Sequence, residues 1–194
     1  MKILIIGNSF VEGIAAKNNF GWAQRFRKEY AQHFIELSGI GGDNILKILA
    51  RLSRYSSYDF DSVILEVGIN DSRFRPSQSG EEVPLPIFKK GINEFANLFK
   101  QSNQNVKIVL IGLTRVNEVL TNPYKEDKYY TNSNIAIYDK ALKDVSHELE
   151  LVYIDMPKLH DKVGLLADGI HPTDKGHNLL YHSIIEGLKR NNVF

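Results

Sequence analysis

The sequence contains no cysteine among its 194 residues. Disulfide bonds, thiolate metal sites and a cysteine nucleophile are therefore excluded. An excess of charge is also lacking, because Lys and Arg total 24, Asp and Glu total 23, and the formal net charge is +1. This balance gives no reason to expect nucleic acid or an acidic lipid surface as a partner. The six histidines are too few and too scattered to suggest a metal-rich tract.

Long apolar runs are lacking as well. No stretch approaches the ~18 uninterrupted apolar residues that a membrane span needs. The first apolar run, residues 3–6, is too short for a signal peptide and is followed at once by Gly7 and Asn8. We therefore expect a cytoplasmic protein without a membrane span. With 43% hydrophobic and 24% charged residues, the chain fits a single globular domain over residues 1–194.

Short apolar runs alternate with amphipathic segments along the chain. Strands are predicted at residues 2–6, 33–37, 61–67, 106–111 and 151–154. Helical spacing of apolar residues is found at 21–32, 45–52, 88–99, 135–149 and 173–189. This alternation predicts an α/β fold, a three-layer α/β/α sandwich with a flavodoxin-like, five-stranded parallel sheet of order 2-1-3-4-5. The polar segments 73–86 and 114–132 are predicted as loops, the first on the surface.

Polar residues that can take part in catalysis follow the predicted strands. Ser9 follows the first strand, Gly42 the second and Asn70 the third, while Asp168 and His171 precede the last helix. The carboxyl ends of parallel strands form one edge of the sheet, where ligands bind. There Ser9 can act as a nucleophile, His171 as its base and Asp168 as the partner that fixes the imidazole tautomer. The N–H groups of Ser9 and Gly42 and the Asn70 amide can bind an oxyanion.

Four short motifs carry a family resemblance. They are Gly7-Asn8-Ser9-Phe10, Gly42-Asp43, Gly68-Ile69-Asn70-Asp71 and Asp168-Gly169-Ile170-His171-Pro172. In this order they resemble the motifs of the SGNH hydrolases, also called GDSL-type esterases and lipases, across essentially the whole chain. The resemblance implies Ser9 as nucleophile and an Asp168–His171 pair that completes the triad. It also implies an oxyanion hole that includes Gly42 and Asn70.

The same resemblance implies a cofactor-free acyl hydrolase with no metal in its site. We expect a serine esterase that cleaves a carboxylic ester through an acyl-enzyme intermediate. Its partner would be a small-molecule ester, namely an acetylated sugar, a metabolite or a lipid. The sequence determines neither the acyl chain, nor the alcohol, nor the oligomeric state.

Two residues depart from the family pattern. Asn8 stands where Asp is usual and removes a negative charge beside Ser9, and Asn44 stands where threonine is common. The first departure keeps an alternative open, a catalytically weakened carbohydrate- or acyl-group-binding module on the same fold. A third hypothesis, a nucleotide-binding flavodoxin-like domain, is less favoured, because residues 39–44 lack the last glycine of the dinucleotide fingerprint and no Walker motif occurs.

Simpler structural roles compete with some functional ones. Ser9 taken alone would more often cap the helix that follows it, and only the four motifs together favour the nucleophile. Asp43 and Asp71 are expected to be solvated loop acids rather than metal ligands. Three further histidines have no acidic partner in a matching motif and are expected to be structural or on the surface: His160, His177 and His182.

An aromatic segment, Tyr124 to Tyr130, lies in the second long loop. Long loops within compact domains are often functional. Two interpretations have equal weight. The segment forms a wall of the substrate pocket together with Phe10 and Phe74, or it packs on its own tyrosines at the surface.

Overall fold

A five-stranded parallel sheet forms the centre of the molecule. The computed structural model describes residues 1–55 and 58–194. The strands of the sheet are β1 (Lys2–Gly7), β2 (Phe34–Gly39), β3 (Ser62–Glu66), β6 (Lys107–Ile111) and β7 (Val152–Ile154). Their order is β2-β1-β3-β6-β7 and every pairing is parallel. The predicted order 2-1-3-4-5 is confirmed, since β6 and β7 are the fourth and fifth predicted strands.

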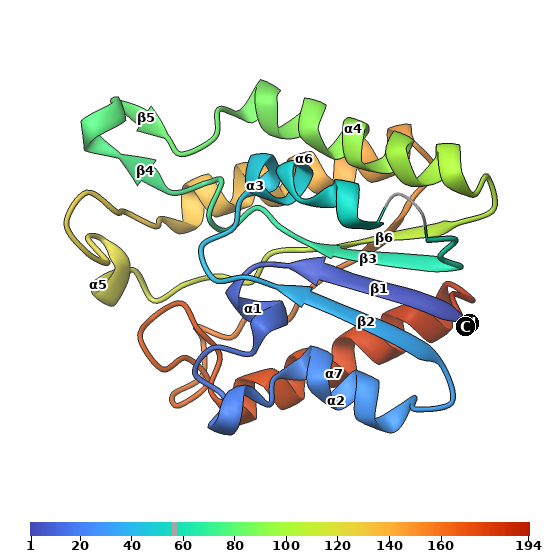
Figure 1. Cartoon of the computed structure of the whole chain (residues 1–194). Helices are drawn as coiled ribbons and strands as arrows, with labels where there is room; N and C mark the ends of the chain where they lie inside the picture. Colours follow the sequence, from blue (N-terminus) through green and yellow to red (C-terminus); the bar gives the residue numbers. More distant parts are fainter. Residues whose placement is uncertain (56–57) are drawn as a thin grey trace.

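Helices cover both faces of the sheet (Figure 1). One face carries α2 (Trp22–Glu29) and α7 (Asp174–Arg190), and the other carries α3 (Ile45–Ala50), α4 (Leu85–Ser102) and α6 (Asn132–Glu148). The long helices bury one apolar side against the sheet, and β1 and β3 are buried on both faces. The three-layer sandwich is therefore confirmed. No helix within residues 1–55 or 58–194 has the length and hydropathy of a membrane span.

The two predicted loops contain short elements. Residues 73–86 include an antiparallel pair, β4 (Phe74–Arg75) and β5 (Gly80–Glu81), and residues 114–132 include α5 (Glu118–Thr121). The remaining short elements are α1 (Ser9–Glu12) and the 3-10 turns Lys17–Asn19, Leu52–Tyr55 and Pro76–Gln78. The prediction of a surface loop at 73–86 is wrong in part, because Arg73 and Val83 are buried. Two-residue strands show no alternation, so no pattern predicts them.

The strands end in step at one edge of the sheet. Gly7 is the register partner of both Gly39 and Glu66, and Glu66 is in turn the partner of Ile111. The segments that follow β1, β2 and β3 therefore leave the sheet side by side. A Cβ on Gly39 would lie 2.2 Å from the Glu12 nitrogen, so α1 can pack on the end of β2 only because residue 39 is glycine.

His177 joins α7 to the amino-terminal segment. Its ring is fully buried, its Nδ1 accepts a hydrogen bond from the Trp22 N–H at 3.3 Å, and its Nε2 lies 3.3 Å from the Ile14 carbonyl oxygen. An amide only donates and a carbonyl only accepts, so the ring is neutral with its proton on Nε2. Burial lowers the pKa of His177 from 6.5 to about 4. The structural role expected for this histidine follows from these contacts.

Protonation of His177 should destabilise the fold at acid pH. Because the folded-state pKa is depressed, the unfolded chain binds more protons between pH 6.5 and about 4. The contribution of the neutral ring is complete above pH 6.5 and is lost as the pH falls toward 4. We expect the free energy of unfolding in urea to fall between pH 7 and pH 4 by on the order of 3 kcal/mol more in the wild type than in His177→Gln. The exposed His182→Gln on the same helix should follow the wild type, and parallel curves for all three proteins would contradict this expectation.

Candidate active site

Ser9, His171 and Asp168 form a continuous hydrogen-bonded chain at the carboxyl edge of the sheet. His171 Nε2 lies 3.0 Å from Ser9 Oγ, and His171 Nδ1 lies 2.7 Å from Asp168 Oδ2. An ionised carboxylate only accepts, so the imidazole proton lies on Nδ1 and Nε2 faces the serine hydroxyl as an acceptor. The structure thus brings together three residues that the sequence separates by up to 162 positions.

Asn8 shapes the turn that carries Ser9. Its Oδ1 accepts a hydrogen bond from the Phe10 N–H at 2.9 Å, so Asn8 is the cap of α1. A capping role for Ser9 is therefore excluded, and its hydroxyl points to His171 instead. The Asn8 amide also approaches the buried Glu66, with Nδ2 at 3.4 Å from Oε1. The amide at position 8 thereby braces the turn on both sides.

Asp168 is held by its own turn and by a distant tyrosine. Its Oδ1 accepts the backbone N–H groups of Ile170 at 3.1 Å and His171 at 2.8 Å. Its Oδ2 also accepts the Tyr124 hydroxyl at 2.8 Å. Burial acts to raise the pKa of Asp168, but the hydrogen bonds from the His171 ring and backbone and from Tyr124 hold it well below its usual range. The carboxylate is therefore ionised at neutral pH and able to stabilise an imidazolium.

Gly42 and Asn70 lie on two loops that are joined beside Ser9. The Asn70 Nδ2 donates to the Asp43 carbonyl at 2.9 Å. A Cβ on Gly41, one residue before Gly42, would lie 3.9 Å from the Ser9 Cβ. Gly42 has a φ of +80°, and a Cβ there would meet nothing within 4 Å. The backbone conformation therefore favours glycine, and this side of the loop faces open space where a ligand atom can lie.

The two aspartates of these loops are buried, so the expectation of solvated loop acids is wrong. Asp43 forms an ion pair with Arg51 at 2.9 Å, and Asp71 Oδ1 accepts the N–H of Ile45 at 2.8 Å. Burial raises the pKa of Asp71 to about 7. Both acids thus hold the loop before α3, where Asn44 serves as the helix cap. Within the described part of the chain, no three His, Asp or Glu side chains are grouped to hold a metal ion.

Comparison with known proteins identifies the family. A model of the GDSL-like lipase/acylhydrolase family matches residues 5–179. The chain belongs to this family. It is similar to the isoamyl acetate-hydrolyzing esterase of Saccharomyces cerevisiae (strain ATCC 204508 / S288c), with 27% identity in an alignment of 155 positions that covers 74% of this chain and 63% of that protein. The match therefore spans less than two thirds of the length of this relative.

Solved structures share the fold of this GDSL-like protein. An acetylxylan esterase from Geobacillus stearothermophilus, solved as a catalytic mutant, has a TM-score of 0.73 at 17% identity, over 96% of this chain and 93% of that chain. The psychrotrophic esterase EstA from Pseudoalteromonas sp. has a TM-score of 0.74 at 18% identity, over 97% of each chain. At this level of identity the likeness concerns the fold alone.

The aromatic segment of the GDSL-like protein faces the candidate site. The Tyr124 ring lies 6.5 Å from the His171 ring, and Phe10 lies 6.3 Å from it on centroid distances. Tyr130 donates its hydroxyl to Asn70 Oδ1 at 3.1 Å. The Tyr124 and Tyr130 rings also pack edge to face at 5.8 Å. The tyrosines therefore pack on each other, and this packing borders the candidate site. A wall of the substrate pocket, together with Phe10 and Phe74, stays a prediction.

Arg51 supports the loop that contains Gly42, and the sequence did not predict this role. Its guanidinium donates to the carbonyls of Gly7 at 3.1 Å and Ser38 at 3.0 Å, and it also binds Asp43. One side chain therefore links the ends of β1 and β2 to the loop that contains Gly42. Nothing in the sequence around position 51 indicates this role, since a basic residue at the end of a helix is ordinarily solvated.

Loss of Arg51 should destabilise the protein strongly. Arg51→Met leaves the buried Asp43 carboxylate without its ion-pair partner and removes one hydrogen bond each from the Gly7 and Ser38 carbonyls, which should cost about 3–5 kcal/mol in the free energy of unfolding. The measurement is urea denaturation at neutral pH. Arg54→Met, an exposed arginine three residues on, is the control and should change stability by less than about 0.5 kcal/mol. If Arg51→Met changed the free energy of unfolding as little as Arg54→Met, the Arg51 contacts would contribute nothing to stability.

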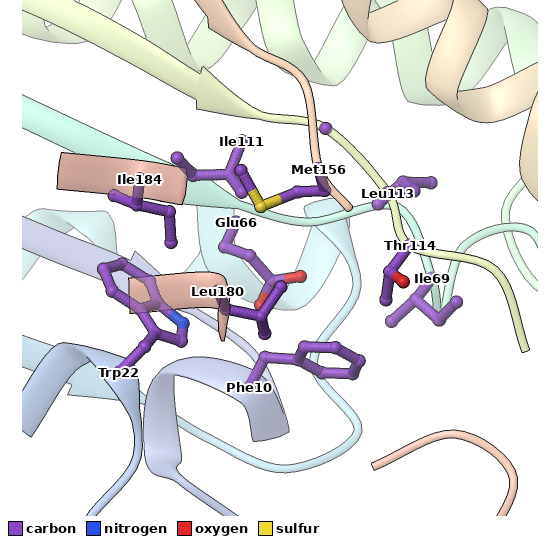
Figure 2. Close-up of a pocket in the computed structure, with 11 residues that line it drawn as sticks. Phe10, Trp22, Glu66, Ile69, Ile111, Leu113, Thr114, Met156, Leu180 and Ile184 are labelled. Carbon is purple, nitrogen blue, oxygen red and sulfur yellow. The ribbon is translucent and has the colours of Figure 1, made fainter. Parts of the chain in front are cut away.

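A small cavity of about 10 Å³ lies behind Phe10, with Glu66 in its lining (Figure 2). It has room for about one water molecule. Apolar side chains form most of the lining, including Trp22, Ile69 and Leu180. Glu66 Oε2 has no hydrogen-bond partner among the described residues. Burial raises the pKa of Glu66 to about 8, so the carboxyl is mostly protonated at neutral pH.

Replacement of Glu66 by glutamine should stabilise the protein at alkaline pH. The pKa of Glu66 rises from 4.5 to about 8 on folding, so the folded state binds more protons between these values. Stability from the neutral carboxyl is present below pH 4.5 and is lost as the pH rises toward 8. Glu66→Gln should therefore raise the melting temperature relative to the wild type at pH 8 by several degrees more than at pH 5. The exposed Glu94→Gln serves as control, and a pH-independent offset for Glu66→Gln would refute the burial of a neutral acid.

Proposed function

We propose that this GDSL-like protein is a serine esterase that cleaves a small-molecule carboxylic ester through an acyl-enzyme intermediate, with residues 1–194 acting as one hydrolase domain. The observation that carries this proposal is the chain of hydrogen bonds from Ser9 through His171 to Asp168, at 3.0 and 2.7 Å. Family membership and the similarity to an isoamyl acetate-hydrolyzing esterase support it.

Acylation begins at the Ser9 hydroxyl. His171 Nε2 takes the proton as Oγ attacks the ester carbonyl carbon, and the carbonyl electron pair moves to oxygen. The resulting oxyanion is bound by the N–H groups of Ser9 and Gly42 and by the Asn70 amide. When the tetrahedral intermediate collapses, the bond to the alcohol oxygen breaks and His171 returns its proton to that oxygen. The alcohol leaves and the acyl group stays on Ser9.

Deacylation repeats these steps with water. His171 takes a proton from a water molecule, which attacks the acyl carbon, and the same donors bind the second oxyanion. Collapse breaks the bond to Oγ, and His171 returns the proton to Ser9 as the carboxylic acid is released. Throughout the cycle Asp168 stays ionised, because the hydrogen bonds that lower its pKa also hold it against the imidazolium.

The proposed substrate carries a short acyl group such as acetyl. The yeast relative is named for hydrolysis of an acetate ester. Acetyl esters of a sugar, a metabolite or a lipid alcohol remain alternative substrates. We expect kcat/KM for p-nitrophenyl acetate to exceed that for p-nitrophenyl octanoate at least about tenfold. A preference for octanoate would exclude the short acyl group without affecting the proposed chemistry.

The alternative of a weakened binding module depended on Asn8. In the structure Asn8 caps α1 and contacts Glu66, so the turn under Ser9 is fully braced. No other observation favours that alternative.

Removal of either reacting group should abolish turnover. Ser9→Ala and His171→Ala should each lower kcat for p-nitrophenyl acetate by about 10⁴-fold or more, because the nucleophile or its base is lost. His182→Ala, an exposed histidine, is the matched control and should keep wild-type kcat. Labelling of the wild type by a fluorophosphonate, followed by intact mass measurement, should add one adduct that Ser9→Ala does not form. A folded wild type that neither turns over the ester nor labels would refute the esterase.

A further inference from the structure

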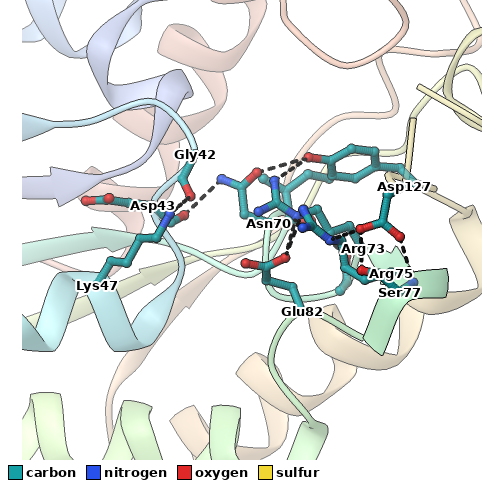
Figure 3. Close-up of polar contacts among 12 residues, drawn as sticks. Gly42, Asp43, Lys47, Asn70, Arg73, Arg75, Ser77, Glu82 and Asp127 are labelled. Carbon is teal, nitrogen blue, oxygen red and sulfur yellow. Dashed lines mark hydrogen bonds and ion pairs between the residues drawn. The ribbon is translucent and has the colours of Figure 1, made fainter. Parts of the chain in front are cut away.

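Two buried groups beside Asn70 have no part in the mechanism described so far. Arg73 is 6% exposed and Tyr130 is 4% exposed. The Arg73 Nη1 lies 3.3 Å from the Tyr130 hydroxyl, and that hydroxyl lies 3.1 Å from Asn70 Oδ1. Figure 3 shows Arg73 between Asn70 and Glu82, with the Asn70 amide directed on its other side to the loop of Gly42 and Asp43.

In the row of hydrogen bonds from Arg73 through Tyr130 and Asn70 to Asp43, the donor and the acceptor of every bond can be assigned. A guanidinium only donates, so the Tyr130 oxygen accepts from Arg73 and its hydroxyl proton is directed to Asn70 Oδ1. The Asp43 carbonyl only accepts, so the atom of Asn70 that faces it must be the nitrogen. The amide is thus fixed in one of its two orientations. One amide hydrogen binds Asp43, and the other remains for an oxyanion.

The Arg73 guanidinium, at the start of this row of hydrogen bonds, is held in place by ion pairing. Arg73 Nε donates to Glu82 Oε2 at 3.1 Å, and Arg75 reaches the same oxygen at 3.5 Å (Figure 3). Burial raises the pKa of Tyr130 despite the nearby Arg73, so its hydroxyl remains a proton donor at neutral pH. Hydrogen bonds in a row polarise one another, most strongly where water is excluded. Electron density drawn toward Asn70 Oδ1 makes the amide hydrogens stronger donors.

We propose that Arg73 and Tyr130 form a positioning relay that orients and polarises the Asn70 amide and so sets how strongly it binds the oxyanion. The inference rests on the proposed esterase function. It adds two residues that touch neither the ester nor Ser9 and that act through Asn70. Because the relay favours charge that develops in the transition state, its loss should lower kcat and leave KM nearly unchanged.

Tyr130→Phe removes the relay hydroxyl and little else. With p-nitrophenyl acetate, kcat should fall about tenfold and KM should stay within about twofold. Tyr138→Phe is the matched control, since Tyr138 is another buried tyrosine, whose hydroxyl donates to the Val83 carbonyl rather than to Asn70. It should keep wild-type kcat. Arg73→Lys keeps the charge but cannot bind Glu82 and Tyr130 from one planar group, so it should lower kcat by a smaller factor.

A double-mutant cycle separates positioning from general support. Asn70→Ala should lower kcat by about 100- to 1000-fold. In the Asn70→Ala background, Tyr130→Phe should change kcat by less than about twofold, because the amide through which it acts is gone. A tenfold loss in both backgrounds, or wild-type kcat for Tyr130→Phe alone, would overturn the relay.

An NMR measurement tests the relay without turnover. The side-chain amide hydrogens of Asn70 should exchange with water faster, and shift upfield, in Tyr130→Phe than in the wild type or Tyr138→Phe. Unchanged Asn70 signals in Tyr130→Phe would overturn the relay even in an active enzyme. If the wild type does not hydrolyse esters, the esterase proposal fails, while the NMR comparison still decides whether Tyr130 orients the amide.

Discussion

The parallel strands end at the same register level, and the position of the site depends on this constraint. Gly7, Gly39 and Glu66 share one register level, so main-chain hydrogen bonds of the sheet determine where the segments after β1, β2 and β3 begin. Glycine at two of these positions lets α1 lie directly on the sheet edge. Positions fixed by the interior of a sheet are more rigid than positions fixed by loops, and such rigidity is what the proposed oxyanion donors require.

A second layer of buried polar contacts turns this edge into a defined site. Arg51 joins the strand ends to Asp43, Asp71 holds the start of α3, and Asn8 joins its turn to Glu66. Each contact buries groups that are costly without partners, so the segments cannot separate without exposing an unpaired charge or amide. Because other arrangements of the loops would leave these groups unpaired, the observed arrangement is favoured over them.

The sequence predicted what depends on local pattern. Apolar runs and helical spacing were enough for the sheet order and the layers, and the four motifs located Ser9, Gly42, Asn70, Asp168 and His171. Roles that depend on long-range contacts carried no such signal. Arg73 lies in a polar stretch that resembles a solvated loop, and Tyr130 lies among several tyrosines. Glu66 lies within the predicted strand 61–67 and was given no role from the sequence, and its partner Asn8 was interpreted from a family pattern rather than from their contact.

The segment from Tyr124 to Tyr130 links the two halves of the site. Its first tyrosine binds Asp168, its last binds Asn70, and six peptide bonds connect them. The proposed acid–base half and the proposed oxyanion half are therefore connected by one short stretch of backbone. An insertion or deletion within this stretch would therefore shift the Asp168 contact and the Asn70 contact together, whereas exchange of its exposed side chains would leave both in place.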